Sequence, residues 1–200
     1  TITEANGVVT IVYKGTTYII PKLPLMSHSM TFTTTKNVGE SLRLKLDAAE
    51  ADRTDIWIDL NNNGTKDSGE DEITFDDFVY FNLGAQTVTI YGKVTTFNCS
   101  NQNITELDVT KNPVLQALNC SHNSLSTLDV SKNTGLMKLY SHMNKIKKAA
   151  MDNLVNSIVN RTGNTPGIYY LYYGSLDENE FEASHASTLA DKNWQKGSLG

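Results

Sequence analysis

The residues whose types and spacing could do chemistry lie together between positions 59 and 70. This stretch reads Asp-Leu-Asn-Asn-Asn-Gly-Thr-Lys-Asp-Ser-Gly-Glu. It fits every ligand position of a twelve-residue calcium-binding loop, with a glycine where that loop turns sharply. The predicted Ca²⁺ ligands are Asp59, Asn61, Asn63, Thr65 through its backbone carbonyl, Asp67 and Glu70. An Asn-Gly hairpin turn among scattered acidic residues is the alternative interpretation.

The segments that flank this loop indicate its role. Residues 55–59 before it and 72–75 after it have strand-like sequences, so the paired helices of a calcium sensor are not expected. We therefore expect a structural clasp between two strands, and the loop resembles the calcium loops of dockerins and bacterial surface modules. Two asparagines among the ligands lower the charge of the site, which suits the high calcium concentration outside cells. The loop thus predicts a cell-surface or extracellular location.

Acidic residues are concentrated around this loop. Residues 47–77 hold 11 of the 22 acidic residues of the chain, against only Arg53 and Lys66, and the net charge of the whole chain is −5. Such a stretch repels phosphate groups, so we expect a cation and no nucleic acid as partner. No apolar run is long enough for a membrane span, so no transmembrane segment is expected.

Catalytic motifs are missing from the sequence. It contains no GxSxG, HExxH, P-loop or GxGxxG pattern, and its four histidines are scattered. His122 and His142 could lie close together, but a zinc or catalytic role for them is not favoured over that of ordinary surface residues. The sequence therefore predicts a protein that is not an enzyme.

A unit of 21 residues occurs twice in succession, over residues 98–118 and 119–139, and begins again at 140–146. Ten positions are identical between the two complete copies. A fixed period of this length is typical of stacked repeats, because one unit cannot bury its own apolar face. Each unit should contain one short parallel strand, followed by an asparagine that satisfies backbone groups in the turn. That position is occupied by Gln102, Asn123 and Asn144, so the first repeat departs from the pattern.

The remaining segments complete an expected two-part organisation. Strand-like runs are predicted at 8–13, 17–20, 30–35, 41–46, 55–59 and 86–91. A helix at 149–159, a strand at 168–173 and a helix at 183–194 would cap the last repeat. The expected fold class is α+β with a repeat: an antiparallel β domain over 1–91, then a leucine-rich repeat solenoid of about three turns with a helix-strand-helix C-terminal cap over 92–196.

The two cysteines, Cys99 and Cys120, occupy the same position in consecutive repeats. Stacked parallel strands would place their side chains close together but pointing in the same direction, which is poor disulfide geometry. Two buried thiols are therefore favoured over a disulfide, and the redox compartment stays open.

Three sequence features together carry a resemblance to a known family. The segment WIDLNNNG, the later YGKV and the repeats of the form LxxLxCxxNxLxxLDVSKNTxL resemble the secreted leucine-rich repeat surface proteins of Bacteroidetes bacteria, over roughly residues 30–160. The resemblance implies a non-catalytic adhesion or host-protein-binding module at the bacterial outer membrane. It also implies a lipid anchor upstream of this sequence, and we expect a monomer.

Any ligand of the repeats should meet the exposed side of their strands. The candidate binding residues there are Asn98, Asn119, Lys138, Tyr140 and His142. The expected partner is a protein or a glycan. Two alternatives stay open, a purely structural spacer of a larger envelope protein and a glycan-binding accessory of polysaccharide utilisation.

Overall fold

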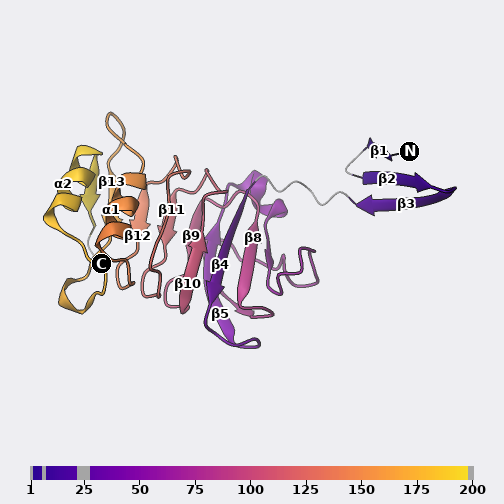
Figure 1. Ribbon diagram of the computed structural model, residues 1–200, viewed down its shortest axis with the longest axis horizontal. Helices are drawn as coiled ribbons and strands as arrows, with labels where there is room; N and C mark the ends of the chain where they lie inside the picture. Colours follow the sequence, from indigo (N-terminus) through magenta and orange to yellow (C-terminus); the bar gives the residue numbers. More distant parts are fainter. Residues whose placement is uncertain (1, 6–7, 22–27, 198–200) are drawn as a thin grey trace.

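The computed structural model describes residues 2–5, 8–21 and 28–197, and most of its regular structure is β-strand (Figure 1). Its strands are β1 (Ile2–Ala5), β2 (Val8–Tyr13), β3 (Thr16–Pro21), β4 (Ser29–Thr34), β5 (Ser41–Asp47), β6 (Trp57–Asp59), β7 (Phe78–Asn82), β8 (Thr87–Tyr91), β9 (Thr96–Asn98), β10 (Ile104–Asp108), β11 (Ala117–Asn119), β12 (Lys138–Tyr140), β13 (Gly167–Tyr170) and β14 (Trp194–Lys196). Its helices are α1 (Lys148–Ser157) and α2 (Ala183–Asp191), with short 3₁₀ segments η1 (Glu50–Asp55) and η2 (Gly174–Leu176). Within the described residues, no helix has the length and apolar character needed to cross a membrane.

The strands form three sheets. Strands β1, β2 and β3 make an antiparallel sheet of their own, and the turn between β2 and β3 uses Lys14 and Gly15 with φ angles of 48° and 77°. The second sheet has the antiparallel order β10-β4-β8-β6. The third has the order β14-β13-β12-β11-β9-β5-β7, in which β9 and β11 to β14 are parallel and β5 runs antiparallel to both of its neighbours. The strands predicted at 8–13 and 17–20 are confirmed by β2 and β3, which pair as a hairpin.

The 21-residue repeat produces three consecutive strands of the seven-stranded sheet. In β9, β11 and β12, each residue is paired with the residue 21 positions away. Their central residues Phe97, Leu118 and Leu139 share one position of the repeat and are at most 1% exposed. The prediction of one short parallel strand per repeat is confirmed.

Asparagine side chains connect the turns that follow these strands. The Asn123 amide donates to the carbonyl of Cys99 (3.0 Å), and its Oδ1 accepts the N–H of Ile104 (2.9 Å). Asn144 donates in the same way to the carbonyl of Cys120, one repeat further along (3.0 Å). These amides supply hydrogen-bond partners to backbone groups of the turns that are buried away from water.

The two ends of this asparagine row differ from its middle. At the first repeat, Gln102 Oε1 accepts the backbone N–H of Arg43 on β5 (2.9 Å), so the longer side chain reaches a neighbour that is not a repeat. At the other end, Asn179 donates to the carbonyls of Ser141 (2.8 Å) and Leu171 (2.9 Å). The hydrogen bonds of these side chains therefore connect the repeats to the segments on both sides of them.

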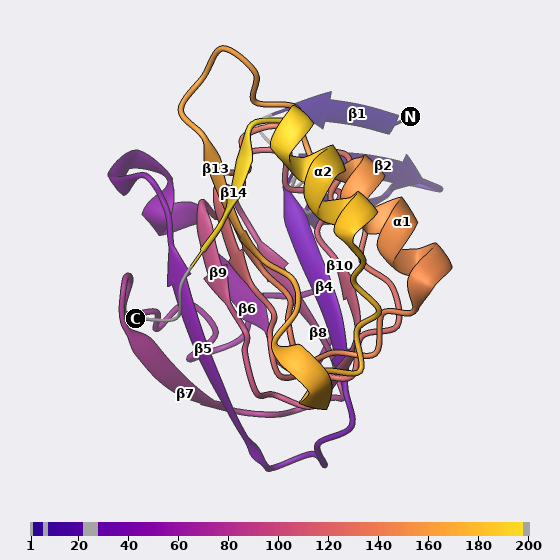
Figure 2. The same cartoon turned by 90° about the vertical axis from the view of Figure 1, so that its left-hand side faces the viewer.

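Helices α1 and α2 and the four-stranded sheet all lie on the same side of the seven-stranded sheet (Figure 2). Helix α1 forms because Met151, Leu154 and Val155 recur on one face and are all buried. Helix α2 begins with a capping box, in which the N–H of Glu182 donates to Nδ1 of His185 (2.8 Å). The predicted order of helix, strand and helix after the last repeat is confirmed by α1, β13 and α2.

The expected fold class, α+β with a separate leucine-rich repeat solenoid, is wrong. The fold is mostly β, and the repeat strands are the middle of a seven-stranded sheet that continues through β5 into β7. The first repeat also supplies β10, which completes the four-stranded sheet beside β4. The physical reason is a shared core: the rings of Phe32 on β4 and Phe97 on β9 lie 6.2 Å apart, so the first repeat packs on the strands that precede it. The division into domains at residue 91 stays a prediction, although both sheets draw strands from both sides of it.

Candidate calcium loop and sheet groove

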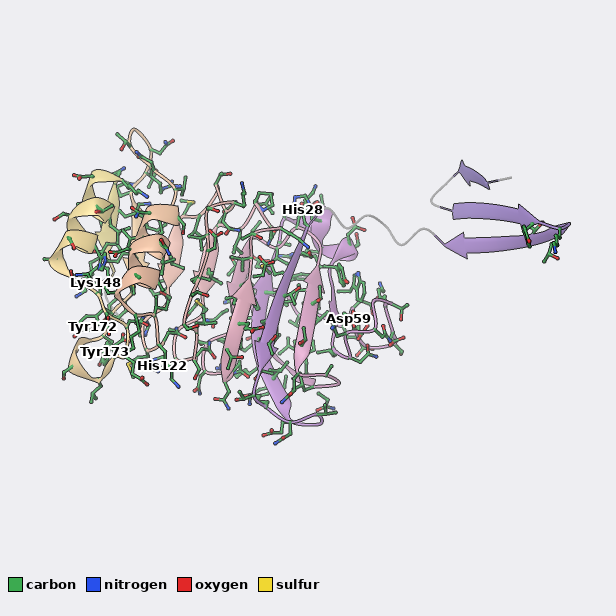
Figure 3. All side chains as sticks on the ribbon, in the orientation of Figure 1. His28, Asp59, His122, Lys148, Tyr172 and Tyr173 are labelled. Atoms are coloured by element: carbon green, nitrogen blue, oxygen red, sulfur yellow. The ribbon has the colours of Figure 1, made fainter. Side chains whose placement is uncertain are left out.

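The loop from 59 to 70 leaves and rejoins the same strand. Strand β6 ends at Asp59, and the N–H of Ile58 donates to the carbonyl of Glu70 (2.8 Å). Gly64 turns the chain with a left-handed φ of 77°, a conformation that favours glycine. Asp59 lies far along the molecule from His122 and Tyr173 (Figure 3), so the loop is remote from the last repeats.

The first carboxylate of the loop, Asp59, has no exposed surface. Its Oδ1 accepts the N–H of Asn63 (3.0 Å) and its Oδ2 that of Gly64 (2.8 Å). Burial, and secondly the Asp59 carboxylate, raise the pKa of the Tyr91 hydroxyl. Trp57 stacks on the Tyr91 ring with centroids 4.4 Å apart, so an aromatic pair stands beside this carboxylate.

The last carboxylate of the loop, Glu70, is 4% exposed and ties the two ends together. Its Oε1 accepts the N–H of Leu60 (2.8 Å), and its Oε2 accepts the N–H of Asp67 (2.9 Å). The third carboxylate is hydrogen-bonded by side chains instead, because Asp67 Oδ2 accepts bonds from the amide N–H groups of Asn61 (2.8 Å) and Asn63 (2.7 Å). Side-chain oxygens and amides of the loop thus form one network.

This network contains three carboxylates and no cation of the protein. The nearby Lys66 pairs with Asp71 (2.6 Å), and no ion pair in the described part of the chain involves Asp59, Asp67 or Glu70. Within those same residues, no three His, Cys, Asp or Glu side chains converge enough to hold a metal by themselves. In the loop the amides of two asparagines lie between the carboxylates, so any cation would need amide as well as carboxylate oxygens.

A neighbouring turn presses against the start of the loop. The N–H groups of Gly84 and Ala85 both donate to the carbonyl of Leu60 (3.0 and 2.8 Å). A Cβ atom on Gly84 would lie 2.9 Å from the Cβ of Asn61, closer than such atoms approach. The glycine therefore allows the turn to hold the loop in place.

The predicted ligands lie close together in the structure, but one of the two flanking segments does not form the expected strand. Asp59, Asn61, Asn63, Asp67 and Glu70 share the network described above, and Thr65 joins it by donating its N–H and hydroxyl to Asn63 Oδ1 (2.8 and 2.7 Å). The expectation of a strand at 72–75 is wrong, because the N–H of Ile73 closes a tight turn on the carbonyl of Asp71. The next strand is β7, which lies in the other large sheet.

A groove of about 420 Å³ lies on the exposed face of the seven-stranded sheet. It is lined by Lys45, Asp76, Phe78, Thr96, Phe97, Asn98, Ala117, Leu118, Asn119, Lys138 and Tyr140. The groove contains four of the five residues that the sequence named as a binding surface. The contribution of β5 and β7 was not predicted from the sequence, because nothing in the repeat pattern indicates which strands pair with the first repeat strand.

The fifth of those residues, His142, does not line this groove. It is 3% exposed, and its ring meets the edges of the His122 and Tyr170 rings at centroid distances of 5.1 and 4.7 Å. Burial, and secondly the neighbouring His122, lower the pKa of His142. Its Nδ1 is buried without a hydrogen-bond partner in the described structure. His142 is thus a packed, neutral ring, and the expected proximity of the two histidines is confirmed.

The cysteines are both free and fully buried, which confirms the preference for two thiols over a disulfide. Burial raises the pKa of Cys120 to about 12. Burial, and secondly the neighbouring Cys120, raise the pKa of Cys99 well above its ordinary value. Neither thiol is activated for chemistry at neutral pH.

Comparison of the chain with models of known protein families, with curated proteins and with solved structures gave no match. The resemblance to secreted leucine-rich repeat surface proteins therefore stays a hypothesis.

Proposed function

We propose that this chain is a non-catalytic binding module of the cell surface or extracellular medium, in which the loop 59–70 holds a structural Ca²⁺ ion. The observation that carries the calcium part is the burial of Asp59 and Glu70 without any protein cation in the described residues. A buried carboxylate is costly unless an opposite charge or a full set of donors offsets it. A divalent cation would supply that charge.

The atoms that the loop offers as metal ligands suit calcium better than other common metals. They are all hard oxygens: carboxylates of Asp59, Asp67 and Glu70, amide oxygens of Asn61 and Asn63, and the Thr65 carbonyl. An amide oxygen has two lone pairs, so Asn61 Oδ1, which accepts the N–H of Asn63 (3.1 Å), can also coordinate an ion. Zinc prefers nitrogen and sulfur ligands, which the loop does not offer.

The ion would act as a clasp rather than a switch. The loop begins directly at the end of β6, and its last residue bonds back to that strand through Ile58. No helix flanks the loop in the described residues, so there is no helix pair for calcium to open. We therefore expect calcium to stabilise the fold without a large change of shape.

Calcium titration of an isosteric variant tests this part of the proposal. Asp59→Asn keeps an oxygen for the N–H of Asn63 but removes the negative charge, so calorimetry should show affinity at least ten-fold weaker. Asp129→Asn is the matched control, because this exposed residue only caps the N–H of Ser131. In the native chain, calcium at 100 times its Kd should raise stability by about 2.7 kcal/mol relative to chelator. Unchanged melting in calcium and chelator would contradict the proposal.

Terbium luminescence locates the ion within the chain. The chain has two tryptophans, and Trp57 lies two residues before the first predicted ligand. Terbium bound in the loop should luminesce on tryptophan excitation, and calcium should displace it. Trp57→Phe should abolish the signal and Trp194→Phe should leave it. The reverse pattern would place the ion elsewhere.

The binding part of the proposal is supported by the groove. Its lining offers amide, ammonium and phenol groups, which form hydrogen bonds and stacking contacts with ligands. A purely structural spacer would share the calcium clasp but would bind nothing in this groove. A ligand that binds there and is lost on substitution of groove residues distinguishes the two.

A further inference from the structure

The outer face of the seven-stranded sheet carries a continuous row of side chains across its strands. Residues paired in adjacent strands follow the order Phe78, Lys45, Asn98, Asn119, Tyr140 and Tyr170. With neighbouring strands about 4.8 Å apart, this row is about 24 Å long. It begins with an aromatic ring, continues through a cation and two amides, and ends with two phenols.

The amides in the middle of this row present donors to a ligand. Asn98 Oδ1 accepts the N–H of Ser100 (3.0 Å), and Asn119 Oδ1 accepts the N–H and hydroxyl of Ser121 (3.1 and 2.7 Å). Their oxygens are therefore occupied, whereas no hydrogen bond within the described residues uses either amide nitrogen. Two amide nitrogens on paired residues of neighbouring strands are therefore open to acceptor atoms of a ligand.

The charges around the row favour an anion. Asp76, the acidic residue of the groove lining, is paired with Lys45 (2.8 Å), and Lys45 lowers its pKa. Beyond that pair, Lys138 is exposed and has no ion-pair partner in the described structure. Lys196 lies 5.9 Å from the Tyr170 ring centre, and Arg43 lies 3.6 Å from that of Phe78. This face is therefore basic on a chain whose net charge is −5.

The form of the surface argues for a glycan rather than an acidic peptide. Extended peptides gain most of their affinity by adding a strand at a sheet edge, and β9, β11 and β12 are internal strands with both edges paired. A peptide bound on the face of these strands would therefore lack the main-chain pairing that an edge strand provides. Sugar rings instead stack their C–H faces on tyrosine rings, and their hydroxyl and carboxylate oxygens accept bonds from amide and ammonium groups.

From these observations we infer that this face binds an unbranched glycan whose sugar units carry carboxylates, a uronate oligosaccharide. The glycan crosses the strands, with its carboxylates toward Lys138 and the amides of Asn98 and Asn119. Its sugar rings stack on Tyr140 and Tyr170. This inference rests on the proposed binding function and names the ligand class of the groove, and it does not depend on the calcium loop.

Calorimetric titration with defined oligosaccharides tests the assignment. Oligogalacturonate and oligomannuronate are the probes, and the methyl-esterified oligogalacturonate is the matched neutral chain. All titrations are made in chelator, because uronates bind calcium themselves. Without free calcium, ion binding by the loop cannot contribute to the measured heat. At least one uronate should bind, with affinity that falls as salt rises. The esterified chain should bind at least ten-fold more weakly.

Substitutions in the groove connect binding to this surface. Lys138→Gln should weaken uronate binding at least ten-fold, and Lys132→Gln, an equal change of charge at an exposed turn, should not. Asn119→Asp keeps the oxygen that Ser121 requires and replaces the donor by a negative oxygen, so it should abolish binding while the melting temperature is maintained.

Several results would overturn the inference. They are no binding of either uronate, equal binding of the esterified chain, tighter binding of dextran sulfate, or binding of polyglutamate with no uronate bound. The last two would leave the proposed binding function intact and change only the ligand. No binding of any probe, with calcium uptake retained, would instead favour the structural spacer. Failure of calcium uptake, by contrast, would not affect these titrations.

Discussion

At the scale of single residues, burial places the side chains of Asp59 and His142 in different surroundings. Asp59 is fully buried, and its carboxylate oxygens accept two backbone N–H groups. His142 is buried among rings, and its pKa is lowered because the charged form would lose hydration and meet His122.

Acidification should destabilise the folded chain through His142. The unfolded chain binds a proton near the ordinary value of 6.5, whereas the folded chain binds it only at lower pH. Between those two values the unfolded state holds more protons, so stability falls as pH falls through this window and levels off below it. The nearby Asp177 opposes this shift, and His122 strengthens it.

A variant with a ring that cannot bind a proton at this position provides the comparison with the native chain. His142→Phe keeps an aromatic ring against Tyr170 and removes the titration, so it should lose less stability than the native chain between pH 7.5 and pH 5. Urea unfolding at each pH measures the difference. Parallel loss of stability in both proteins would show that His142 does not titrate differently on folding.

At the scale of elements, asparagine side chains hold the repeats in register. Asn144 donates to the carbonyls of Cys120 and Ser141 (3.0 Å each), and its Oδ1 accepts the N–H of Leu125 (2.9 Å). Asn144→Ala would leave these buried groups with fewer partners, and an unsatisfied buried group costs about 1–3 kcal/mol. Urea unfolding should show a loss of about 3 kcal/mol or more. The exposed helical Asn153→Ala is the control and should lose nothing. Equal effects of the two substitutions would refute a role for the asparagine row.

The Gly84 turn should control calcium uptake from outside the loop. Gly84→Ala would place a Cβ 2.9 Å from Asn61 and 3.0 Å from the carbonyl of Leu60, so the start of the loop must move. We expect weaker calcium binding by calorimetry and a lower melting temperature in calcium. Gly163→Ala, in a turn with nothing within 4 Å of the added Cβ, should change stability without changing calcium affinity. Unaltered affinity in Gly84→Ala would show that the turn does not position the ligands.

The sequence predicted these elements better than their assembly. A 21-residue period identifies the core positions of β9, β11 and β12 because every unit must bury the same side of its strand. The joining of β5 and β7 to the first unit has no periodic signal, since it depends on contacts between segments distant in sequence. Gln102 illustrates the limit: it departs from the asparagine pattern, and only the position of Arg43 explains its length. The clustering of the loop side chains from Asp59 to Glu70 was predictable from local spacing alone, whereas the place of Lys45 and Phe78 in the groove was not.

At the scale of the whole molecule, the two larger sheets share one core. Both contain strands from each side of residue 91, and β4 and β10 pair across that position, as do β5 and β9. Residues from both parts, including Phe32, Leu46 and Phe97, belong to a single buried cluster. The repeats are therefore stabilised by the strands that precede them as well as by one another.

This shared core predicts how the chain responds to truncation. A fragment of residues 92–197 would lose the partners of β9 and β10 and expose the apolar side chains that Phe32 and Leu46 cover, so it should not unfold cooperatively. A fragment of residues 28–197 is the matched control, because β1–β3 pair only with one another among the described strands. It should keep the sharp thermal transition of the full chain. Circular dichroism melts and the dispersion of amide NMR signals measure both. A cooperative transition in the 92–197 fragment would show instead that the repeats form an independent domain, with the boundary that the sequence pattern suggested.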